Sequence, residues 1–210
     1  MTVDYGSHGR AWRDRVSRFG PERSVLNAKR KTPESRAEFD RIQFGAVLPI
    51  LRSQRRESDR SILDYGCGIG RWSCILGTMG TVLAVDPTPE ILASAPRDTP
   101  SVSYLPLGCG RIPCWPRAVD VVFSCLVLNA ITDPEMLAET VAEFDRALKP
   151  GGLLFLVDLT WRHQVESTWS VMRSADEYAE LFRDVAPLSV LGSYEDLGEI
   201  HSIMAGRKPE

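Results

Sequence analysis

The chain has 210 residues, of which 43% are hydrophobic and 25% charged, which predicts one globular domain of moderate size. Its net charge of −3 provides no broad basic field, so we expect no bulk nucleic acid as a partner. No run approaches the roughly 20 apolar residues of a membrane span, and no signal peptide opens the chain. These features favour a cytoplasmic protein without membrane attachment.

Residues 1–57 contain no strand pattern and predict an N-terminal helical cap on a main part formed by residues 58–210. Two helical segments are expected, over 9–19 and 34–52, with a polar stretch between them. Apolar residues of the second segment recur at helical spacing and predict a stripe that packs on a sheet: Phe39, Ile42, Ala46 and Ile50.

Three alternating glycines follow the first strand pattern. Residues 62–70 read Ile-Leu-Asp-Tyr-Gly-Cys-Gly-Ile-Gly, which predicts a strand, a tight turn and the start of a helix. Glycine is needed where the backbone takes a positive φ or lies against a ligand. The spacing differs from the G-x-G-x-x-G of dinucleotide sites and suits a cationic ligand without a phosphate. Asp64 is placed to hold the ammonium group of such a ligand.

A second strand is expected over 81–85 and ends at Asp86, 16 residues beyond Gly70. In a doubly wound fold, an acid at this place accepts hydrogen bonds from ribose hydroxyls. Thr88 is the expected N-cap of the next helix, with Pro89 in its first turn.

Strands and helices continue to alternate, which predicts βαβ units and a parallel sheet. Asp133 and Pro134 begin a helix whose apolar residues form one stripe, and Leu148-Lys-Pro-Gly-Gly152 ends it. Further strands are expected over 101–105, 119–124, 153–157, 188–195 and 199–205, with a helix over 174–183. The stripe of the helix that starts at Pro134 contains Leu137, Val141, Phe144 and Leu148.

The glycine turn, the acid at position 86 and the Leu-Lys-Pro-Gly-Gly string resemble the motifs of class I S-adenosylmethionine (SAM)-dependent methyltransferases, over residues 61–158. This resemblance implies an α/β, doubly wound, Rossmann-like fold with seven strands in the order 3-2-1-4-5-7-6 and an antiparallel last strand. It also implies methyl transfer from SAM to an O, N, C or S atom of a small molecule, without a metal, in specialised metabolism. S-adenosylhomocysteine (SAH) would be the product.

The resemblance also assigns the cofactor residues. Asp64 and the glycines would bind the amino-acid end of SAM, and Asp86 would bind the ribose. The backbone of residues 108–110 would bind the adenine, with Ile112 and Pro87 covering the faces of its ring. Gly108 departs from the family, which often has an aspartate there for the adenine amino group. Arg71 either approaches the ligand carboxylate or stays in solvent. The full set is Asp64, Gly66, Cys67, Gly68, Gly70, Arg71, Asp86, Pro87, Gly108, Cys109, Gly110, Ser124 and Cys125.

The five cysteines are odd in number and contain no C-x-x-C pair, which predicts reduced thiols and neither a disulfide framework nor a zinc site. Cys67 and Cys109 each lie in an expected binding turn, where lining the pocket and packing are both open.

The sequence says less about the identity of the methyl acceptor than about the cofactor. The region after the fourth strand lacks the Asn/Asp-Pro-Pro-aromatic string of DNA amino-methyltransferases, the paired glutamates of arginine methyltransferases and the acids of metal-dependent enzymes, so we expect a small-molecule acceptor. His163 is the candidate base, and Asn129 the candidate for orienting a polar acceptor. A wall for the acceptor is expected from Tyr5, Trp12, Trp161 and Trp169.

Each of these acceptor residues has a purely structural alternative: a loop histidine, a helix cap or aromatic cover for the core. Two other functions also stay open. One is a SAM-binding protein that transfers no methyl group, and the other is a nicotinamide-dependent oxidoreductase. A monomer and a homodimer are both compatible with the sequence.

Overall fold

The computed structural model describes residues 5–25, 32–162 and 170–210, with residues 5–8 and 162 described by their backbone alone. Its strands form a single seven-stranded sheet in the order β3-β2-β1-β4-β5-β7-β6. Strands β1 to β5 are parallel, while β7 runs antiparallel to both β5 and β6, as the resemblance implied. The strands are β1 (Ser61–Tyr65), β2 (Thr81–Asp86), β3 (Val102–Pro106), β4 (Val119–Cys125), β5 (Leu148–Arg162), β6 (Ser189–Asp196) and β7 (Glu199–Arg207).

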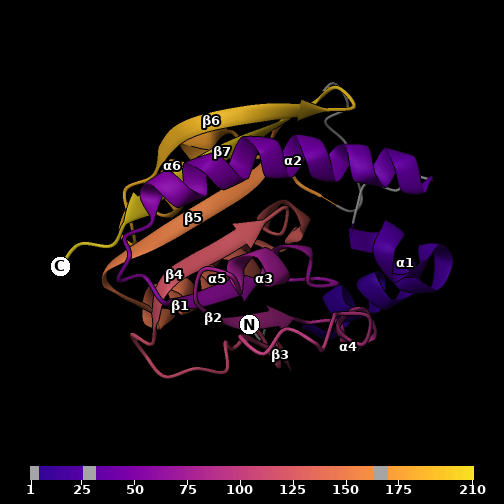
Figure 1. Ribbon diagram of the computed structural model, residues 1–210, viewed down its shortest axis with the longest axis horizontal. Coiled ribbons are helices and arrows are strands. Elements are labelled where there is room, and N and C mark those ends of the chain that lie inside the picture. Colours follow the sequence, from indigo (N-terminus) through magenta and orange to yellow (C-terminus); the bar gives the residue numbers. More distant parts are fainter. Residues whose placement is uncertain (1–4, 26–31, 163–169) are drawn as a thin grey trace.

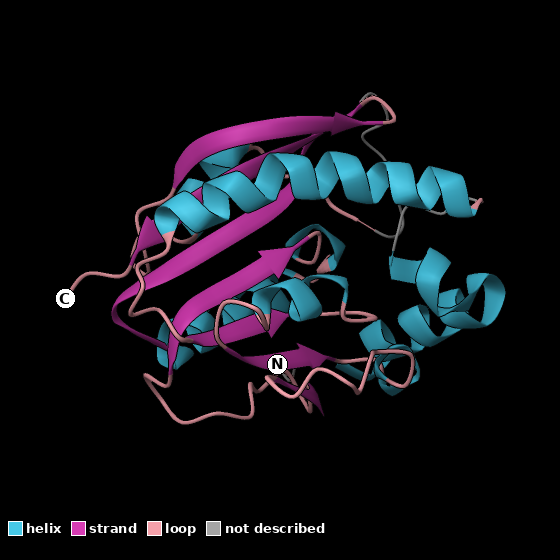
Figure 2. Cartoon of the chain, in the orientation of Figure 1, coloured by secondary structure: helices cyan, strands magenta, loops and turns pink. Residues whose placement is uncertain are grey.

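Helices cover both faces of this sheet (Figures 1 and 2). One buried cluster joins the sheet to α2 and α3, and a second joins the opposite face to α5 and α6. Ile62 and Leu63, adjacent in β1, belong to different clusters because successive strand side chains point to opposite faces. The helices are α1 (Tyr5–Val25), α2 (Pro33–Gln54), α3 (Arg71–Leu76), α4 (Pro89–Leu92), α5 (Pro134–Ala147), α6 (Ala175–Leu181) and the 3₁₀ turn η1 (Leu128–Ala130).

Helix α2 begins with a capping box, in which Thr32 and Ser35 each bond the other's backbone N–H. The predicted stripe along this helix packs on the sheet: Phe39 is buried in the core cluster, and Ile42, Ala46 and Ile50 are partly buried against it. The fully buried row lies beside this stripe and consists of Phe39, Gln43, Val47 and Leu51. A search for apolar residues at helical spacing does not find a buried polar residue such as Gln43.

Helix α1 is longer than the predicted segment and contains a kink at Gly20, where φ is 76° and ψ is 165°, directly before Pro21. The hydroxyl of Ser24 donates to the Gly20 carbonyl over 2.6 Å, which satisfies an acceptor that the kink frees. Figure 1 shows α1 beyond the carboxyl ends of the parallel strands, beside α4. The N-terminal segment therefore lies where ligands of open α/β sheets bind.

Other boundaries also differ from the predictions. Strand β5 begins at Leu148, so the Leu-Lys-Pro-Gly-Gly string belongs to the strand, but Gly151 in it has a φ of 71° and interrupts the extended backbone. It pairs with β4 across a register shift between Val119 and Val121. Asp133 caps helix α5, as predicted. Its carboxylate accepts hydrogen bonds from the amides of Glu135 and Met136 over 2.8 and 3.4 Å. Helix α6 ends at Leu181, two residues before the predicted end.

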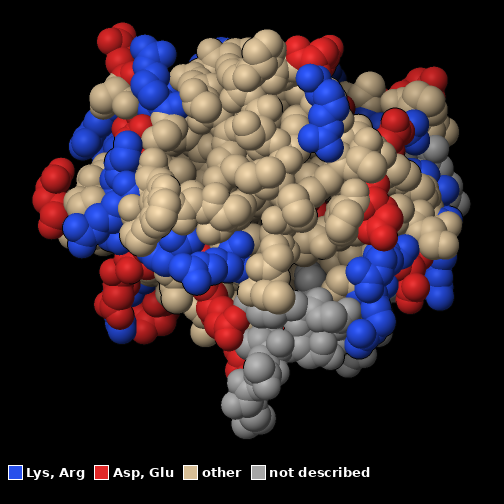
Figure 3. All heavy atoms as spheres, turned by 90° about the horizontal axis from the view of Figure 1, so that it is seen from below, with Lys and Arg blue, Asp and Glu red and all other residues tan. Residues whose placement is uncertain are grey.

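The face of the molecule seen in Figure 3 has a broad uncharged surface, with Lys, Arg, Asp and Glu mixed around its margin. Within the described ranges, no helix has both the length and the apolar character needed to cross a membrane.

Candidate cofactor site

A cavity with about 490 Å³ of space between its walls, which includes open solvent, lies at the carboxyl ends of β1, β2 and β4. Helix α1 supplies one wall, and the segments that follow β1, β2 and β4 supply the others. The lining residues are Trp12, Val25, Gly66, Gly68, Asp86, Pro87, Thr88, Ile91, Cys125, Leu126, Val127 and Ala130.

The glycine turn after β1 forms the floor of this cavity. Gly66 and Gly68 have φ values of 71° and 57°, which favour glycine. A Cβ atom at Gly68 would lie 2.9 Å from a methyl group of Val25 in α1, and one at Gly66 would overlap Val127. Glycine is therefore required both by the backbone conformation and by the close approach of two other walls.

Asp86 ends β2 at the edge of the cavity, as predicted. Its Oδ2 accepts a hydrogen bond from the Gly68 amide over 3.1 Å, and Oδ1 accepts one from the Thr88 amide over 2.8 Å. Burial raises the pKa of Asp86 to about 6, although these two hydrogen bonds oppose the rise. The site therefore contains a carboxylate that a cationic or hydroxyl-bearing ligand would stabilise in its ionised form.

Thr88 occupies the predicted N-cap position, but its side chain caps nothing. The hydroxyl oxygen is buried beside the Asp86 carboxylate and has no hydrogen bond of good geometry to any described residue. Because unpaired buried polar groups are costly, this oxygen in a cavity wall is a natural contact for a ligand. The sequence prediction treated Thr88 only as a helix cap and missed this role.

Asp64 lies behind the glycine turn and is not among the cavity-lining residues. It is 2% exposed and accepts a hydrogen bond of 2.6 Å from the hydroxyl of Ser73 in α3. Burial, with a smaller contribution from the charge of Asp86, raises the pKa of Asp64 to about 7. Neighbouring Cys67 is also buried, and burial raises the pKa of its thiol.

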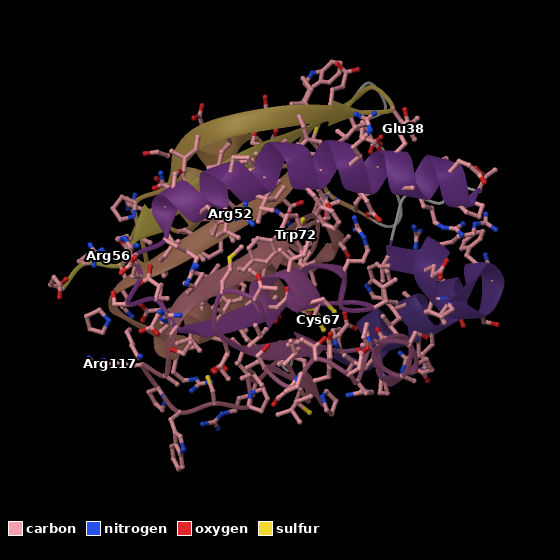
Figure 4. All side chains as sticks on the ribbon, in the orientation of Figure 1. Glu38, Arg52, Arg56, Cys67, Trp72 and Arg117 are labelled. Carbon is pink, nitrogen blue, oxygen red and sulfur yellow. The ribbon has the colours of Figure 1, made fainter. Side chains whose placement is uncertain are left out.

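Arg71 binds another helix, an arrangement that the sequence prediction did not consider. Its guanidinium forms an ion pair with Asp40 and donates to Gln43 Oε1 over 3.1 Å, both in α2. Trp72 donates to the same amide oxygen over 3.2 Å and lies under α2 (Figure 4). Gln43 in turn donates to the hydroxyl of Tyr194 over 2.7 Å. Arg71 thus joins α3 to α2 and is absent from the cavity wall.

The segment after β4 forms the wall opposite β2. Cys125 lines the cavity, and burial raises the pKa of its thiol. Ser124 is 2% exposed, and its hydroxyl has no hydrogen-bond partner among the described residues. Leu126 has a φ of 59°, which is unusual for a residue with a side chain.

Asp158 lies in β5, directly after the residues that pair with β4, and was missed by the sequence analysis. It is 1% exposed, and burial raises its pKa to about 7. Its Oδ2 accepts hydrogen bonds from the amides of Leu128 and Asn129 in η1. The signal that could have found it is an acid after a buried apolar run, the same pattern that singled out Asp64 and Asp86.

The predicted adenine segment lies apart from the cavity wall. Gly108 and Arg111 form an isolated bridge around the exposed Cys109, and Gly110 has a φ of 73°. The following Ile112 is buried in the α5 side of the core. Pro87 does line the cavity.

The candidate acceptor residues divide into three groups. Trp12 lines the cavity, with the guanidinium carbon of Arg15 5.7 Å from the centre of its ring. Asn129 and Trp161 are both absent from the lining: the Asn129 amide oxygen is buried without a hydrogen-bond partner in the described ranges, and Trp161 is 42% exposed. His163, Trp169 and the side chain of Tyr5 lie outside the described residues.

The described part of the chain contains no group of three or more His, Cys, Asp or Glu placed to share a metal ion. The polar groups at the cavity are instead a carboxylate, a threonine hydroxyl and backbone amides. These groups can bind hydroxyl and ammonium groups of an organic ligand.

Comparison with known proteins agrees with this geometry. Residues 63–156, which run from β1 to β5, match the family model described as a methyltransferase domain. These 94 residues, less than half of the chain, are similar to a methyltransferase domain. An uncharacterised methyltransferase from Synechocystis sp. is 32% identical over 101 residues, which cover 48% of this chain and 47% of that protein. The chain thus spans about half the length of this curated relative.

Solved structures share the methyltransferase fold at low identity. A phosphoethanolamine N-methyltransferase from Haemonchus contortus, solved with phosphoethanolamine and SAH, aligns with a TM-score of 0.73 and 18% identity, over 99% of this chain and 50% of that one. The complex of DhpI with SAH aligns over 98% of both chains, with a TM-score of 0.68 and 20% identity.

Proposed function

We propose that this chain binds SAM in the cavity at the strand ends and transfers its methyl group to a small molecule. The observation that carries the proposal is the position of the Thr88 hydroxyl beside the Asp86 carboxylate and the glycine turn: the carboxylate accepts from the Thr88 amide, while the buried hydroxyl has no hydrogen bond of good geometry. A ribose offers two adjacent hydroxyl groups, and these two side chains offer adjacent acceptors for them.

The residues fit the cofactor in charge and in shape. SAM carries a sulfonium and an ammonium group, and the buried carboxylates of Asp86 and Asp64 favour cations nearby. The positive φ values of Gly66 and Gly68 and their close packing against Val127 and Val25 shape the floor of the cavity. Pro87 and Ile91 give an apolar surface for the adenine. Arg71 is not assigned to the ligand carboxylate, because its guanidinium already pairs with Asp40.

When bound, SAM supplies a methyl group already activated on sulfur, so the chain's own task is to orient the acceptor and exclude water. Trp12 and the segment after β4 are the described walls available for the acceptor. The buried amide oxygen of Asn129 is the described group best suited to orient a polar acceptor. A base at His163 and stacking on Tyr5, Trp161 and Trp169 stay predictions, as do Gly108–Gly110 at the adenine, the cytoplasmic location and the monomeric or homodimeric state.

A small-molecule acceptor is supported by the similar structure from Haemonchus contortus, which was solved with phosphoethanolamine. The atom methylated here, whether O, N, C or S, is best found by screening small molecules with radiolabelled SAM.

Calorimetry with SAH tests the cofactor directly, with NADH as the control ligand. We expect SAH to bind and NADH to give no heat. Asp86→Asn should weaken SAH binding about tenfold or more, the usual effect of losing a hydrogen bond to a charged group. Asp133→Asn is the matched control, because it changes an acid that only caps α5. Failure of the wild-type protein to bind SAH would contradict the proposal.

A further inference from the structure

The turn that follows β4 needs support from outside itself. This post-β4 turn, residues 126–131, contributes Leu126, Val127 and Ala130 to the cavity wall. It contains only the single 3₁₀ turn η1 and begins with the positive φ of Leu126. So short a turn with an unfavourable backbone conformation holds its position only when its neighbours fix it.

Asp158 holds the amide side of the post-β4 turn. One carboxylate oxygen accepts hydrogen bonds from the Leu128 amide over 2.9 Å and the Asn129 amide over 3.2 Å. The other oxygen accepts from the Leu159 amide over 2.8 Å, which fixes the orientation of the carboxyl group on β5. An ionised carboxylate makes such bonds stronger than a neutral acceptor would.

Arg173 holds the carbonyl side of the same turn. Its two terminal nitrogens donate to the carbonyls of Leu128 and Ile131, each over 2.9 Å. The Val171 amide adds a bond of 2.7 Å to the Asn129 carbonyl. The planar fork of a guanidinium can reach two separate carbonyls at once, which a lysine ammonium cannot do with the same geometry.

We infer that Asp158 and Arg173 are positioning residues, which fix the post-β4 turn and thereby set the affinity of the cavity for its ligand. The inference rests on the proposed function, since the ligand is taken to be SAM or SAH. Val127 couples the turn to the floor of the cavity because it fills the space above Gly66. A displacement of the turn therefore moves one wall and releases the glycine turn at the same time.

A second pair with the same chemistry lies elsewhere and provides a matched control. Arg146 donates to the carbonyls of Cys114 and Ile112 over 2.8 and 2.9 Å, and Glu143 accepts from the Ile112 amide over 2.8 Å. This pair also fixes a short segment between strands, but neither partner nor segment lines the cavity. Loss of Arg146 reports the cost of such a clamp to stability alone.

The test measures thermal stability and the dissociation constant for SAH in four variants of the full chain. Asp158→Asn and Arg173→Gln should each weaken SAH binding about tenfold or more, because a hydrogen-bonded charge is lost. Arg173→Lys, the milder variant if Arg173→Gln does not fold, should give an intermediate loss. Arg146→Gln should lower the melting temperature to a similar degree and leave the dissociation constant within about twofold of wild type.

Two results overturn the inference alone: unchanged SAH affinity in Asp158→Asn and Arg173→Lys, or an equal loss of affinity in Arg146→Gln. The second would show that SAH binding only follows global stability. Amide hydrogen exchange adds a ligand-free measurement, in which Arg173→Lys should speed exchange at Leu128 and Asn129 and leave the amides of β1 protected. Absence of SAH binding by wild-type protein would instead overturn the proposed function, and the inference with it.

Discussion

The amide of Gly68 donates a hydrogen bond of 3.1 Å to Oδ2 of Asp86, which connects the turn after β1 directly to the acid that ends β2. Both residues line the cavity. The protonation state of one side chain therefore affects two parts of the site, since a protonated carboxyl is a weaker acceptor for the glycine turn as well as for a ligand.

SAH binding should depend on pH through Asp86. The pKa of this carboxyl is about 6 in the free protein, and ligand hydroxyl and ammonium groups favour its ionised form. Affinity should therefore be constant well above pH 6 and fall as the pH drops below it, approaching a tenfold loss per pH unit. Calorimetry between pH 5 and 8 measures this. The Asp86→Asn variant should show a flatter profile, and an unchanged profile would assign the titration to another group.

Gly68→Ala should impair the site through one added methyl group. The new Cβ atom would lie 2.9 Å from a methyl group of Val25, at a φ of 57° that disfavours side chains. We expect SAH affinity to fall roughly tenfold or more, with far-ultraviolet circular dichroism unchanged. Gly45→Ala is the control: its Cβ atom meets nothing within 4 Å, so α2 should become more stable by about 0.5–1 kcal/mol with no change in affinity. Equal affinities in the two variants would contradict the close packing of α1 on the turn.

Thr88→Val separates ligand binding from stability. Valine has the shape of threonine without its hydroxyl, and this hydroxyl makes no hydrogen bond of good geometry to any described residue. The free energy of unfolding without ligand should therefore stay the same or increase, while SAH binding loses about 0.5–1.5 kcal/mol. Urea denaturation and calorimetry measure the two quantities. A lower free energy of unfolding with unchanged SAH affinity would instead indicate that Thr88 acts only as a helix cap.

Asp64→Asn tests the carboxylate behind the glycine turn. The pKa of Asp64 is about 7 when folded, above its value in the unfolded chain, so the folded protein binds this proton more tightly. Stability without ligand should then be fully present at about pH 4 and decrease as the pH rises to about 7. Urea denaturation across this range should show a weaker decrease in Asp64→Asn.

If Asp64 also holds the ammonium group of SAM, the Asp64→Asn variant binds SAM less tightly by about 1.5–3 kcal/mol. Unchanged binding would leave Asp64 a structural role only.

Much of the architecture follows from local patterns. Strands β1, β2 and β4 are short apolar runs, two of them closed by an acid, and Asp133 with Pro134 marks the start of α5 without ambiguity. The glycine turn and Asp86 were found in the same way. These signals are local because they depend on strand periodicity, helix capping and backbone conformation.

The remaining features depend on partners far along the chain. Arg71 lies in α3, but its function is set by Asp40 and Gln43 in α2. An acid after an apolar run could have marked Asp158, but its partners, the amides of η1 about 30 positions earlier in the chain, could not be found from the sequence. No spacing rule connects such residues, so single-sequence reasoning left Arg71 either at the ligand carboxylate or in solvent and did not predict its partners in α2.

The hydrogen bond between Gln43 and Tyr194 joins residues that are 151 positions apart in the sequence. Helix α2 is synthesised before any strand of the sheet that it covers, whereas Tyr194 arrives with β6, near the end of the chain. The polar member of the buried row of α2 therefore meets the last of its partners only when nearly the whole polypeptide has been made. Contacts of such long range slow folding. Because α2 packs on β5 and β6, its apolar row stays exposed during synthesis until those strands follow, and exposed apolar surface promotes premature association.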